Sequence, residues 1–461
     1  MSRGKELHEK FEKECQEDDG RLLRRVSRSK VQNFAAENTK RKRTSTAAGK
    51  QTTEGVRDMF IRMVVIISQQ TAFDLRHVMT FPVTQYPLAI AHSDGTPLKT
   101  CKAKLLQKLE TLQDGYTQSD LPPVDVTLVD GGLLLHTFLS VTNSATYSAM
   151  ARSLLIKVCS NPGVEIHVLF DTYDRSSIKE IERRLRGAED RPFVISGPLQ
   201  VSRQSGQQLL KNGNFKDQLA AFVLEEWGKN QYGPILGGKI LIVSHGGNCC
   251  RYIYNAQNEC IAVDRPSHLQ GKHEEADTLI AFHASNVAGC IVVRASDTDV
   301  MAILIHMLGR HVESGTQGPT VIMDCGVANN RRYIDLNQIV KALEAMQPGL
   351  SLAIIAIHVF TGTDFTTAFY RKGKVGPLEI LMKDSSGRFI KAFRNISTAD
   401  KPDEPTLQEY TCVVYGQSGQ VDINEVRHAK LLQMTGKINQ VSKACTVLLW
   451  FTLLPVEVFC N

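Results

Sequence analysis

The sequence predicts an α/β protein in which helices sandwich a mostly parallel sheet. Three observations support this fold class. Strand-like segments alternate with segments of helical periodicity, the strand-like segments are mostly apolar, and several of them end in aspartate. Continuously apolar strands are buried on both faces, as parallel strands connected through helices are. The 461 residues suffice for one large core with extensions or for two or three domains.

Residues 1–55 are predicted to form a basic, mostly mobile arm. Between residues 21 and 50 there are ten Lys or Arg and one acid, Glu37, in a chain whose formal net charge is +6. The run Lys40-Arg-Lys-Arg43 suits nucleic-acid contact or a location in the nucleus, alone or together with the cytoplasm, and a solvated tail is the alternative. Residues 56–120 are expected to form an accessory N-terminal layer with a helix at 102–112, to which no chemistry is assigned.

The eleven cysteines include no Cys-x-x-Cys pair, and the first residues are not apolar, so free thiols in a reducing compartment are expected. Cys249, Cys250 and Cys260 match no structural zinc spacing, and buried free cysteines are the expectation. The chain contains no Gly-x-x-x-x-Gly-Lys-Ser/Thr motif of nucleotide triphosphatases. Its apolar residues 444–460 are too short and interrupted for a membrane span, and no membrane contact is expected.

The regular alternation begins with a strand at residues 124–130 that ends in an acid. The pair Gly131-Gly132 predicts a turn, and the apolar residues 133–141 predict the start of a helix. A second strand at residues 164–171 also ends in an acid, and a basic helix follows at residues 178–186. These elements form the first strand–helix–strand unit of the expected sheet.

The same alternation continues to about residue 346. Its further elements are a helix at 215–227, a strand at 239–244, a helix opening with acids at 274–283, a strand ending at Asp297, a strand at 320–324 and a helix at 337–346. One domain is thus expected at residues 121–385, with a C-terminal extension at 386–461.

Three strands of this pattern terminate in aspartate, at Asp130, Asp171 and Asp297. Asp299 follows two residues later and can point the same way as Asp297 along an extended chain. Ligands of open parallel sheets bind at the carboxyl ends of the strands, so distant residues can converge there. Unpaired buried carboxylates are costly unless a cation or donors receive them, which favours a divalent metal site. The alternative is that each aspartate caps the helix that follows it.

Taken together, these motifs resemble the flap-endonuclease branch of the PIN-like nucleases, the structure-specific 5′-nucleases. The similarity covers residues 124–383 and lies in the motifs and their order. The matching segments are Val129-Asp130-Gly-Gly, Phe170-Asp171, His273-Glu-Glu275-Ala-Asp277, Ser296-Asp297-Thr-Asp299 and Thr361-Gly362-Thr-Asp364-Phe365. About 120 residues precede the core here, whereas the family's core begins near its N-terminus.

The resemblance implies a site for two Mg²⁺ or Mn²⁺ ions, a pair that stabilises both the attacking and the leaving oxygen of a phosphodiester displacement. Hard cations of this kind prefer oxygen ligands. The implied metal ligands are Asp130, Asp171, Glu275, Asp277, Asp297, Asp299 and Asp364. Glu274 shares a helix face with Asp277 more naturally than Glu275 does and is a reserve ligand.

On the basic helix, the family steers the scissile phosphate with a Lys and an Arg, which implies catalytic roles for Lys179 and Arg184 and a nucleic-acid contact for Arg183. His136 falls where the family has an aromatic that stacks on the substrate. For the basic helix the alternative is a solvated face, because acids alternate with the bases, and for His136 it is a structural role.

The segment Gly373-Lys-Val-Gly376-Pro377 resembles the turn of the family's helix-two-turn-helix element, with its glycines one residue further apart. Glycines let backbone N–H groups approach a phosphate, and Lys372 and Lys374 add positive charge. The implied nucleic-acid contacts are therefore Lys372, Gly373, Lys374 and Gly376. An ordinary helix–loop–helix turn is the alternative.

The function expected from these residues is metal-dependent hydrolysis of nucleic acid, by a structure-specific DNA nuclease with a two-metal carboxylate site. A catalytically silent PIN-like module that binds nucleic acid or protein is the second hypothesis. The segment Asp297-Thr-Asp299-Val also resembles the nucleophile motif of haloacid-dehalogenase phosphatases. That motif normally opens its domain, whereas two acid-tipped strands precede it here.

Overall fold

The computed structural model describes residues 2–17, 90–92, 95–117, 119–139, 146–172, 191–201, 204–396 and 401–426. The chain divides into two units, Met1–Ile66 and Ile67–Asn461. In the first unit, α1 (Ser2–Glu17) is a helix whose described side chains are mostly exposed. The second unit contains the sheet and every candidate site residue that the structure describes.

The second unit is built on an eight-stranded sheet with the order β5-β4-β3-β2-β1-β6-β7-β8. Strands β3, β2, β1, β6 and β7 run parallel, and β4, β5 and β8 run antiparallel to their neighbours. The prediction of an α/β fold with a mostly parallel sheet is confirmed. The strands are β1 (Val126–Asp130), β2 (Glu165–Leu169), β3 (Ile240–His245), β4 (Asn248–Asn255), β5 (Cys260–Asp264), β6 (Cys290–Arg294), β7 (Thr320–Cys325) and β8 (Arg332–Asp335).

Strand β1 lies where the direction of strand order reverses. The chain moves from β1 to β2 and β3 on one side, and later returns to β6 and β7 on the other. Val126 pairs with Glu165 of β2 and with Ile291 of β6, so the carboxyl ends of these three strands lie level. Open parallel sheets bind ligands in the crevice at such a reversal. The topology therefore puts Asp130, Asp171 and Asp297 at one edge of the sheet.

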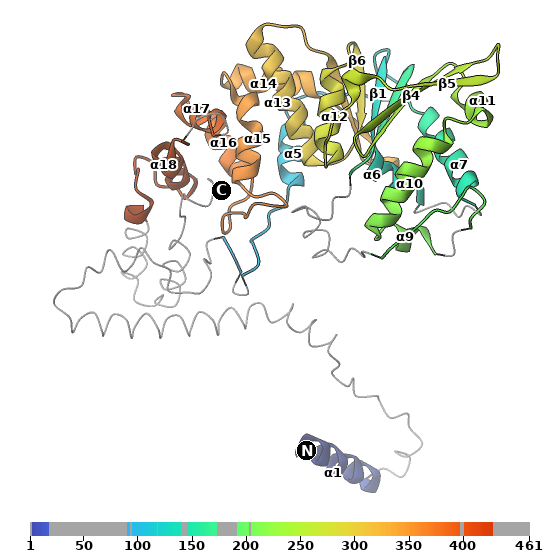
Figure 1. Ribbon diagram of the computed structural model, residues 1–461. Helices are drawn as coiled ribbons and strands as arrows, with labels where there is room; N and C mark the ends of the chain where they lie inside the picture. Colours follow the sequence, from blue (N-terminus) through green and yellow to red (C-terminus); the bar gives the residue numbers. More distant parts are fainter. Residues whose placement is uncertain are drawn as a thin grey trace, which may run out of the picture. The chain divides into compact units, whose positions relative to one another are not determined.

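Helices cover both faces of the sheet (Figure 1). One face packs on α6 (Gly131–Leu139), α7 (Tyr147–Cys159), α9 (Gly206–Leu209), α10 (Gly213–Glu226) and α11 (Gly233–Leu236). The other core contains α5 (Ala103–Glu110), α12 (Ala276–Ser285), α13 (Thr298–Ser314), α14 (Leu336–Met346), α15 (Leu350–Phe360), α16 (Val375–Met382), α17 (Arg388–Arg394) and α18 (Glu404–Val414). Short 3₁₀ turns lie at Asn230–Tyr232, Ser267–Leu269 and Ala328–Asn330.

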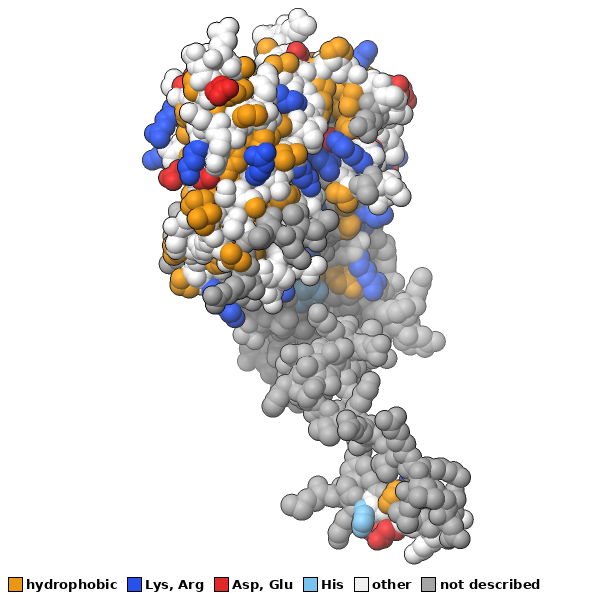
Figure 2. All heavy atoms as spheres, turned by 90° about the vertical axis from the view of Figure 1, so that its right-hand side faces the viewer, with side chains coloured by type: hydrophobic (Ala, Val, Ile, Leu, Met, Phe, Trp, Pro, Cys, Tyr) orange, Lys and Arg blue, Asp and Glu red, His pale blue; other side chains and the backbone are white. Residues whose placement is uncertain are grey.

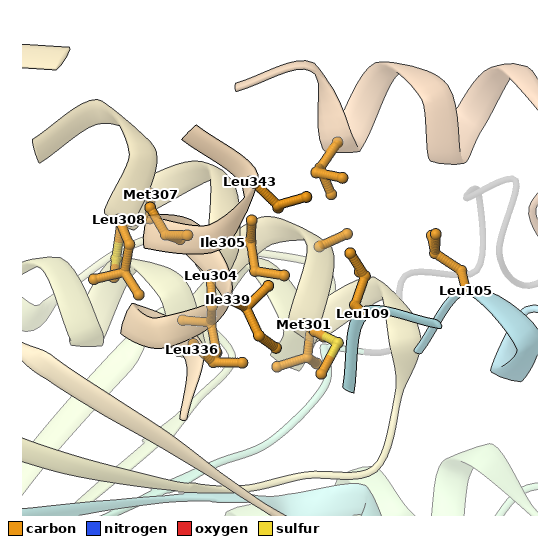
Figure 3. Close-up of a cluster of buried hydrophobic side chains, with 14 of the residues drawn as sticks. Leu105, Leu109, Met301, Leu304, Ile305, Met307, Leu308, Leu336, Ile339 and Leu343 are labelled. Atoms are coloured by element: carbon orange, nitrogen blue, oxygen red, sulfur yellow. The ribbon is translucent and has the colours of Figure 1, made fainter. Parts of the chain in front are cut away.

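Helix α5 confirms the helix expected at residues 102–112, and it is part of the main core. Leu105, Leu106 and Leu109 are almost fully buried in the same cluster as α13 and α14. Figure 3 shows Leu109 of α5 beside Met301 of α13 in this cluster. The packing fixes the position of Lys102, the residue that precedes the helix.

Most predicted elements are observed within a few residues of their expected bounds. The predicted basic helix at 178–186 lies outside the described residues. The structure also contains elements that were not predicted, namely the antiparallel strands β4, β5 and β8 and several helices. Cys249 and Cys250 are free and buried on β4, as expected. No single described helix is long and apolar enough to span a membrane; α14 and α15 meet those criteria only as a pair, which is bent by 97°.

Gly131 allows α6 to begin directly after β1. A Cβ atom at this position would lie 2.4 Å from Cδ1 of Phe170 and 2.7 Å from the carbonyl oxygen of Leu169, which are both closer than a side chain tolerates. The turn predicted at Gly131-Gly132 is not observed, because both glycines belong to the first turn of α6, and the close approach of the end of β2 explains why position 131 is a glycine. This approach also brings Asp130 and Asp171 near each other.

Candidate metal centre

Asp130 ends β1 with its carboxylate directed at the start of α6. Its Oδ1 accepts hydrogen bonds from the backbone N–H groups of Gly132, at 2.8 Å, and Leu133, at 3.2 Å. Burial and the negative charge of Asp171 raise its pKa to about 6 despite these two bonds, and Asp297 adds to the rise. Asp130 thus caps the helix and also belongs to a crowded group of acids.

Asp171 follows β2 and ties that strand to the beginning of α12. Its Oδ1 accepts a hydrogen bond from the N–H of Ala276 at 2.8 Å. The N–H of Thr172 donates to the carbonyl oxygen of Glu274, also at 2.8 Å. The two bonds bring the acidic segment at the start of α12 to the end of β2. Glu275 occupies the N-cap position of that helix.

The first turns of α12 and α13 bring three carboxylates together. Asp297 is the N-cap of α13, and its side chain accepts the N–H of Asp299 at 3.0 Å. Asp277 lies in the first turn of α12. One carboxylate oxygen from each of Asp277, Asp297 and Asp299 lies within 4.8 Å of the other two, a spacing at which three oxygens can share one cation. Hard divalent ions accept such all-oxygen sets.

Lys102 completes the group from a distant part of the chain. Its Nζ lies 2.8 Å from Oδ2 of Asp364, 2.9 Å from Oδ2 of Asp299 and 3.8 Å from Oδ1 of Asp297. Burial lowers the pKa of Lys102, but the hydrogen bonds to Asp364 and Asp299 outweigh it and raise the pKa above its ordinary value. The ammonium therefore stays charged among these acids.

His358 of α15 holds Asp299 from the opposite side. Its Nε2 lies 2.6 Å from Oδ1 of Asp299. Burial raises the pKa of Asp299, but the hydrogen bonds from His358 and Lys102 prevail and lower it to about 2. Nδ1 of His358 is buried without a hydrogen-bond partner in the described part of the chain. The contact orients the Asp299 carboxylate.

These contacts link most of the sequence-predicted metal ligands into one group. Electrostatic interaction joins Asp130 to Asp171 and Asp297, and the carboxylate triad and Lys102 add Asp277, Asp299 and Asp364. Glu275 is the N-cap of α12, two residues before Asp277. The backbone carbonyl of Glu274 accepts a hydrogen bond from the N–H of Thr172, next to Asp171. Lys102 and His358 were not predicted. A lysine at the start of an amphipathic helix and a histidine in an apolar run carry no motif.

The residues predicted to contact nucleic acid differ from one another in exposure and in the side chains that they contact. His136 is exposed in the last turn of α6. Gly373 and Gly376 are exposed at the start of α16, and a Cβ atom on either would meet no atom within 4 Å. The ammonium of Lys372 lies 4.8 Å from the centre of the Tyr415 ring. Lys179, Arg183 and Arg184 lie outside the described residues.

The prediction that Lys374 contacts nucleic acid is wrong. Its side chain is 1% exposed, and its Nζ donates to the carbonyl oxygen of His358 at 2.7 Å and to Oγ1 of Thr361 at 3.1 Å. These acceptors lie at the carboxyl end of α15, where the helix dipole favours a positive group. Burial lowers the pKa of Lys374 to about 7. Lys374 joins the turn to α15 instead of facing solvent.

A basic hollow opens on the α6 and α7 side of the sheet. It encloses about 330 Å³ and is lined in part by Lys157, Arg294 and Arg331. Both arginines pair with Asp324, whereas Lys157 donates to the hydroxyl of Thr137. The three basic side chains carry three positive charges against the one negative charge of Asp324, which leaves an excess of two. Arg294 lies at the end of β6, the strand that leads to Asp297.

No protein-family model matches the chain, and no curated protein matches its sequence.

Proposed function

We propose that this chain is a metal-dependent nuclease that hydrolyses phosphodiester bonds of nucleic acid, most favourably DNA at branches, flaps or junctions. The proposal is carried by one observation, namely the convergence of acids from β1, β2, α12, α13 and the loop after α15 at the strand-order reversal. The acids lie up to 234 residues apart in sequence, from Asp130 to Asp364. Such a group gains stability from a cation that pairs with its charges.

We also propose that the chain belongs to the PIN-like, 5′-nuclease-like group, which is a more specific statement than the observed α/β fold class. This membership is supported by the order of the acidic motifs. It is also supported by the segment between α15 and α16, which contains Asp364 and Gly373, with Gly376 and Pro377 in the first turn of α16. We propose that this region acts as a helix-two-turn-helix element that contacts the nucleic-acid backbone. The proposal also includes a nuclear location, on the basis of Lys40-Arg-Lys-Arg43.

The residues that would hold Mg²⁺ or Mn²⁺ are the acids of the group, and they fit because every donor is a carboxylate oxygen. When bound, such an ion activates water near neutral pH and stabilises charge on phosphate oxygens. The chain's own residues position the reaction. Asp130 and Asp297 are fixed by backbone N–H groups, and His358 fixes Asp299.

The proposed nucleic-acid contacts are His136, Lys372, Gly373 and Gly376, with Lys179, Arg183 and Arg184 on the undescribed basic segment. On the face drawn in Figure 2, Lys and Arg side chains are more frequent than Asp and Glu. The basic hollow at Lys157 adds positive charge on the α6 and α7 side of the sheet. Basic surfaces of this kind favour a phosphate backbone as partner, independently of base sequence.

Cleavage of end-labelled DNA tests this proposal. The full chain is incubated in Mg²⁺ with a branched duplex, with a linear duplex of the same sequence and with single-stranded RNA. The proposal expects cuts near the branch point of the first substrate and little cutting of the other two. Equal resistance of all three substrates in both Mg²⁺ and Mn²⁺ would refute it.

The binding of Mn²⁺ is expected to depend on pH through Asp130. Its pKa of about 6 means that the carboxyl is mostly protonated at pH 5 and ionised at pH 7.5. Because metal must displace that proton, affinity should fall about tenfold for each pH unit below 6. An ion present at about 100 times its dissociation constant adds about 2.7 kcal/mol to the free energy of unfolding.

The measurement is the melting temperature with and without Mn²⁺ at the two pH values. A clear rise at pH 7.5 and a smaller one at pH 5 are expected. An equal rise at both would show that the ion binds away from Asp130.

A catalytically silent module that binds nucleic acid is the second candidate. The observation that favours it is Lys102, whose ammonium already pairs with three of the acids and lowers the need for a metal. The same Mn²⁺ titration decides between the candidates, because a silent module should melt at one temperature with or without the ion.

A further inference from the structure

Lys102 occupies a place where the resemblance implies a metal ion. Asp299 and Asp364, both implied ligands, each direct Oδ2 at its ammonium, at 2.9 Å and 2.8 Å. A third implied ligand, Asp297, lies 3.8 Å away. An ammonium and a divalent cation attract the same carboxylate oxygens. A Mg²⁺ ion would need those two oxygens at about 2.1 Å, which is the space that Nζ fills.

The ammonium is held in place by structure on both sides of it. Next to Lys102, α5 buries Leu105, Leu106 and Leu109 against the core that contains α13. Before it, the carbonyl oxygen of Leu98 accepts the N–H of Ala368 at 2.9 Å. Lys99 also contacts the backbone carbonyl of Asp364. Because both flanks are anchored, Lys102 is a fixed part of the site.

The acids divide into two sides with respect to Lys102. Asp299 and Asp364 receive its ammonium directly. On the β1 and β2 side, Asp130 and Asp171 accept backbone N–H groups of Gly132, Leu133 and Ala276. Asp297 belongs to both sides, since it lies close to Lys102 and interacts with Asp130.

We propose that this site takes one divalent cation rather than two, and that Lys102 permanently supplies the second positive charge. The inference rests on the proposed function, and it changes the expected content of the site from two ions to one ion and one ammonium. Asp277 and Asp297, whose carboxylate oxygens lie within 4.8 Å of each other, are the acids of the triad that remain for the single ion. Asp299 and Asp364 then position Lys102 rather than a metal.

Counting bound Mn²⁺ tests the inference without any cleavage assay. The full-length chain is titrated with Mn²⁺ at pH 7.5, and the ions per chain are determined by native mass spectrometry and by electron paramagnetic resonance of the free ion. The wild type should bind one ion. Lys102→Met should bind two, because Asp299 and Asp364 become available.

Lys99→Met is the matched control. It removes the same charge three residues away, from a side chain that donates to the backbone carbonyl of Asp364, and it should still bind one ion. Lys102→Gln, a polar replacement of similar length, is the second variant should Lys102→Met fail to fold, and it should also bind two. Circular dichroism verifies the fold of each variant.

The outcomes separate this inference from the function on which it rests. Two ions in the wild type, or one in both Lys102 variants, would overturn the inference and leave the metal-dependent nuclease intact. No bound ion in the wild type would overturn the proposed function as well.

Discussion

Replacing Asp297 and Asp299 together by asparagine is expected to lower cleavage of a branched duplex about a thousandfold, since metal charge stabilises the transition state by several kcal/mol. Both side chains belong to the carboxylate triad with Asp277. The fold should survive the change. Asparagine at position 297 can still cap α13, because Asn is as good an N-cap as Asp. Removing the charge of Asp297 also relieves its repulsion with Asp130.

Asp264→Asn is the control for this double variant. Asp264 is exposed at the end of β5 and pairs with Arg251, a surface contact that contributes little to stability. Cleavage rates with Mg²⁺ and melting temperatures are measured for all three proteins. Full cleavage by the double variant would show that the group is not the reaction site. Loss of cleavage by Asp264→Asn would show that the assay reports damage to the fold.

Replacing Lys374 by methionine is expected to stabilise the protein near pH 7 and to destabilise it near pH 10. Burial lowers the pKa of Lys374 to about 7 in the folded chain from an ordinary 10.5. Between these values the unfolded chain holds a proton that the folded chain lacks, so the stability of the wild type rises with pH across this window. The difference corresponds to about 4 kcal/mol at neutral pH.

Methionine removes that cost but loses two hydrogen bonds, to His358 and Thr361, worth about 1 kcal/mol each. The order of stabilities should therefore reverse between pH 7 and pH 10. Urea unfolding at both pH values measures it. Lys391→Met, at an exposed position of α17, should show no reversal. A parallel loss of stability for Lys374→Met at both pH values would contradict the assigned burial effect.

Lys374→Met also tests whether the Lys374 side chain has a structural role or contacts DNA. The sequence Arg-Lys-Gly-Lys reads as an exposed charge run, because nothing local shows that one lysine turns inward. The structure buries Lys374 against the end of α15 while Gly373 and Gly376 stay exposed. Lys374→Met should thus leave affinity for DNA unchanged.

The central strands were predictable from sequence because their signal is local. Residues 126–130, 165–169 and 290–294 are short apolar runs that end at or just before an acid, and helical patterns follow the first and third of them. Strands β4 and β5 lack this signal. They form the antiparallel edge, where buried and exposed residues mix. A parallel-sheet pattern does not detect such strands.

The acids of the site were predictable for the same reason, but the groups that hold them were not. Lys102 reaches Asp299 across 197 residues and Asp364 across 262, and His358 reaches Asp299 across 59. These pairings depend on how α5 and α15 pack on α13. Packing of that kind is decided by the whole core, so a lone Lys or His in sequence gives no sign of it.

Anomalous diffraction from crystals soaked in Mn²⁺ tests the metal centre most directly. Data collected at the manganese edge should show a peak within about 2.5 Å of carboxylate oxygens of both Asp130 and Asp297. The absence of a peak there, in crystals whose surface acids do bind manganese, would contradict the account.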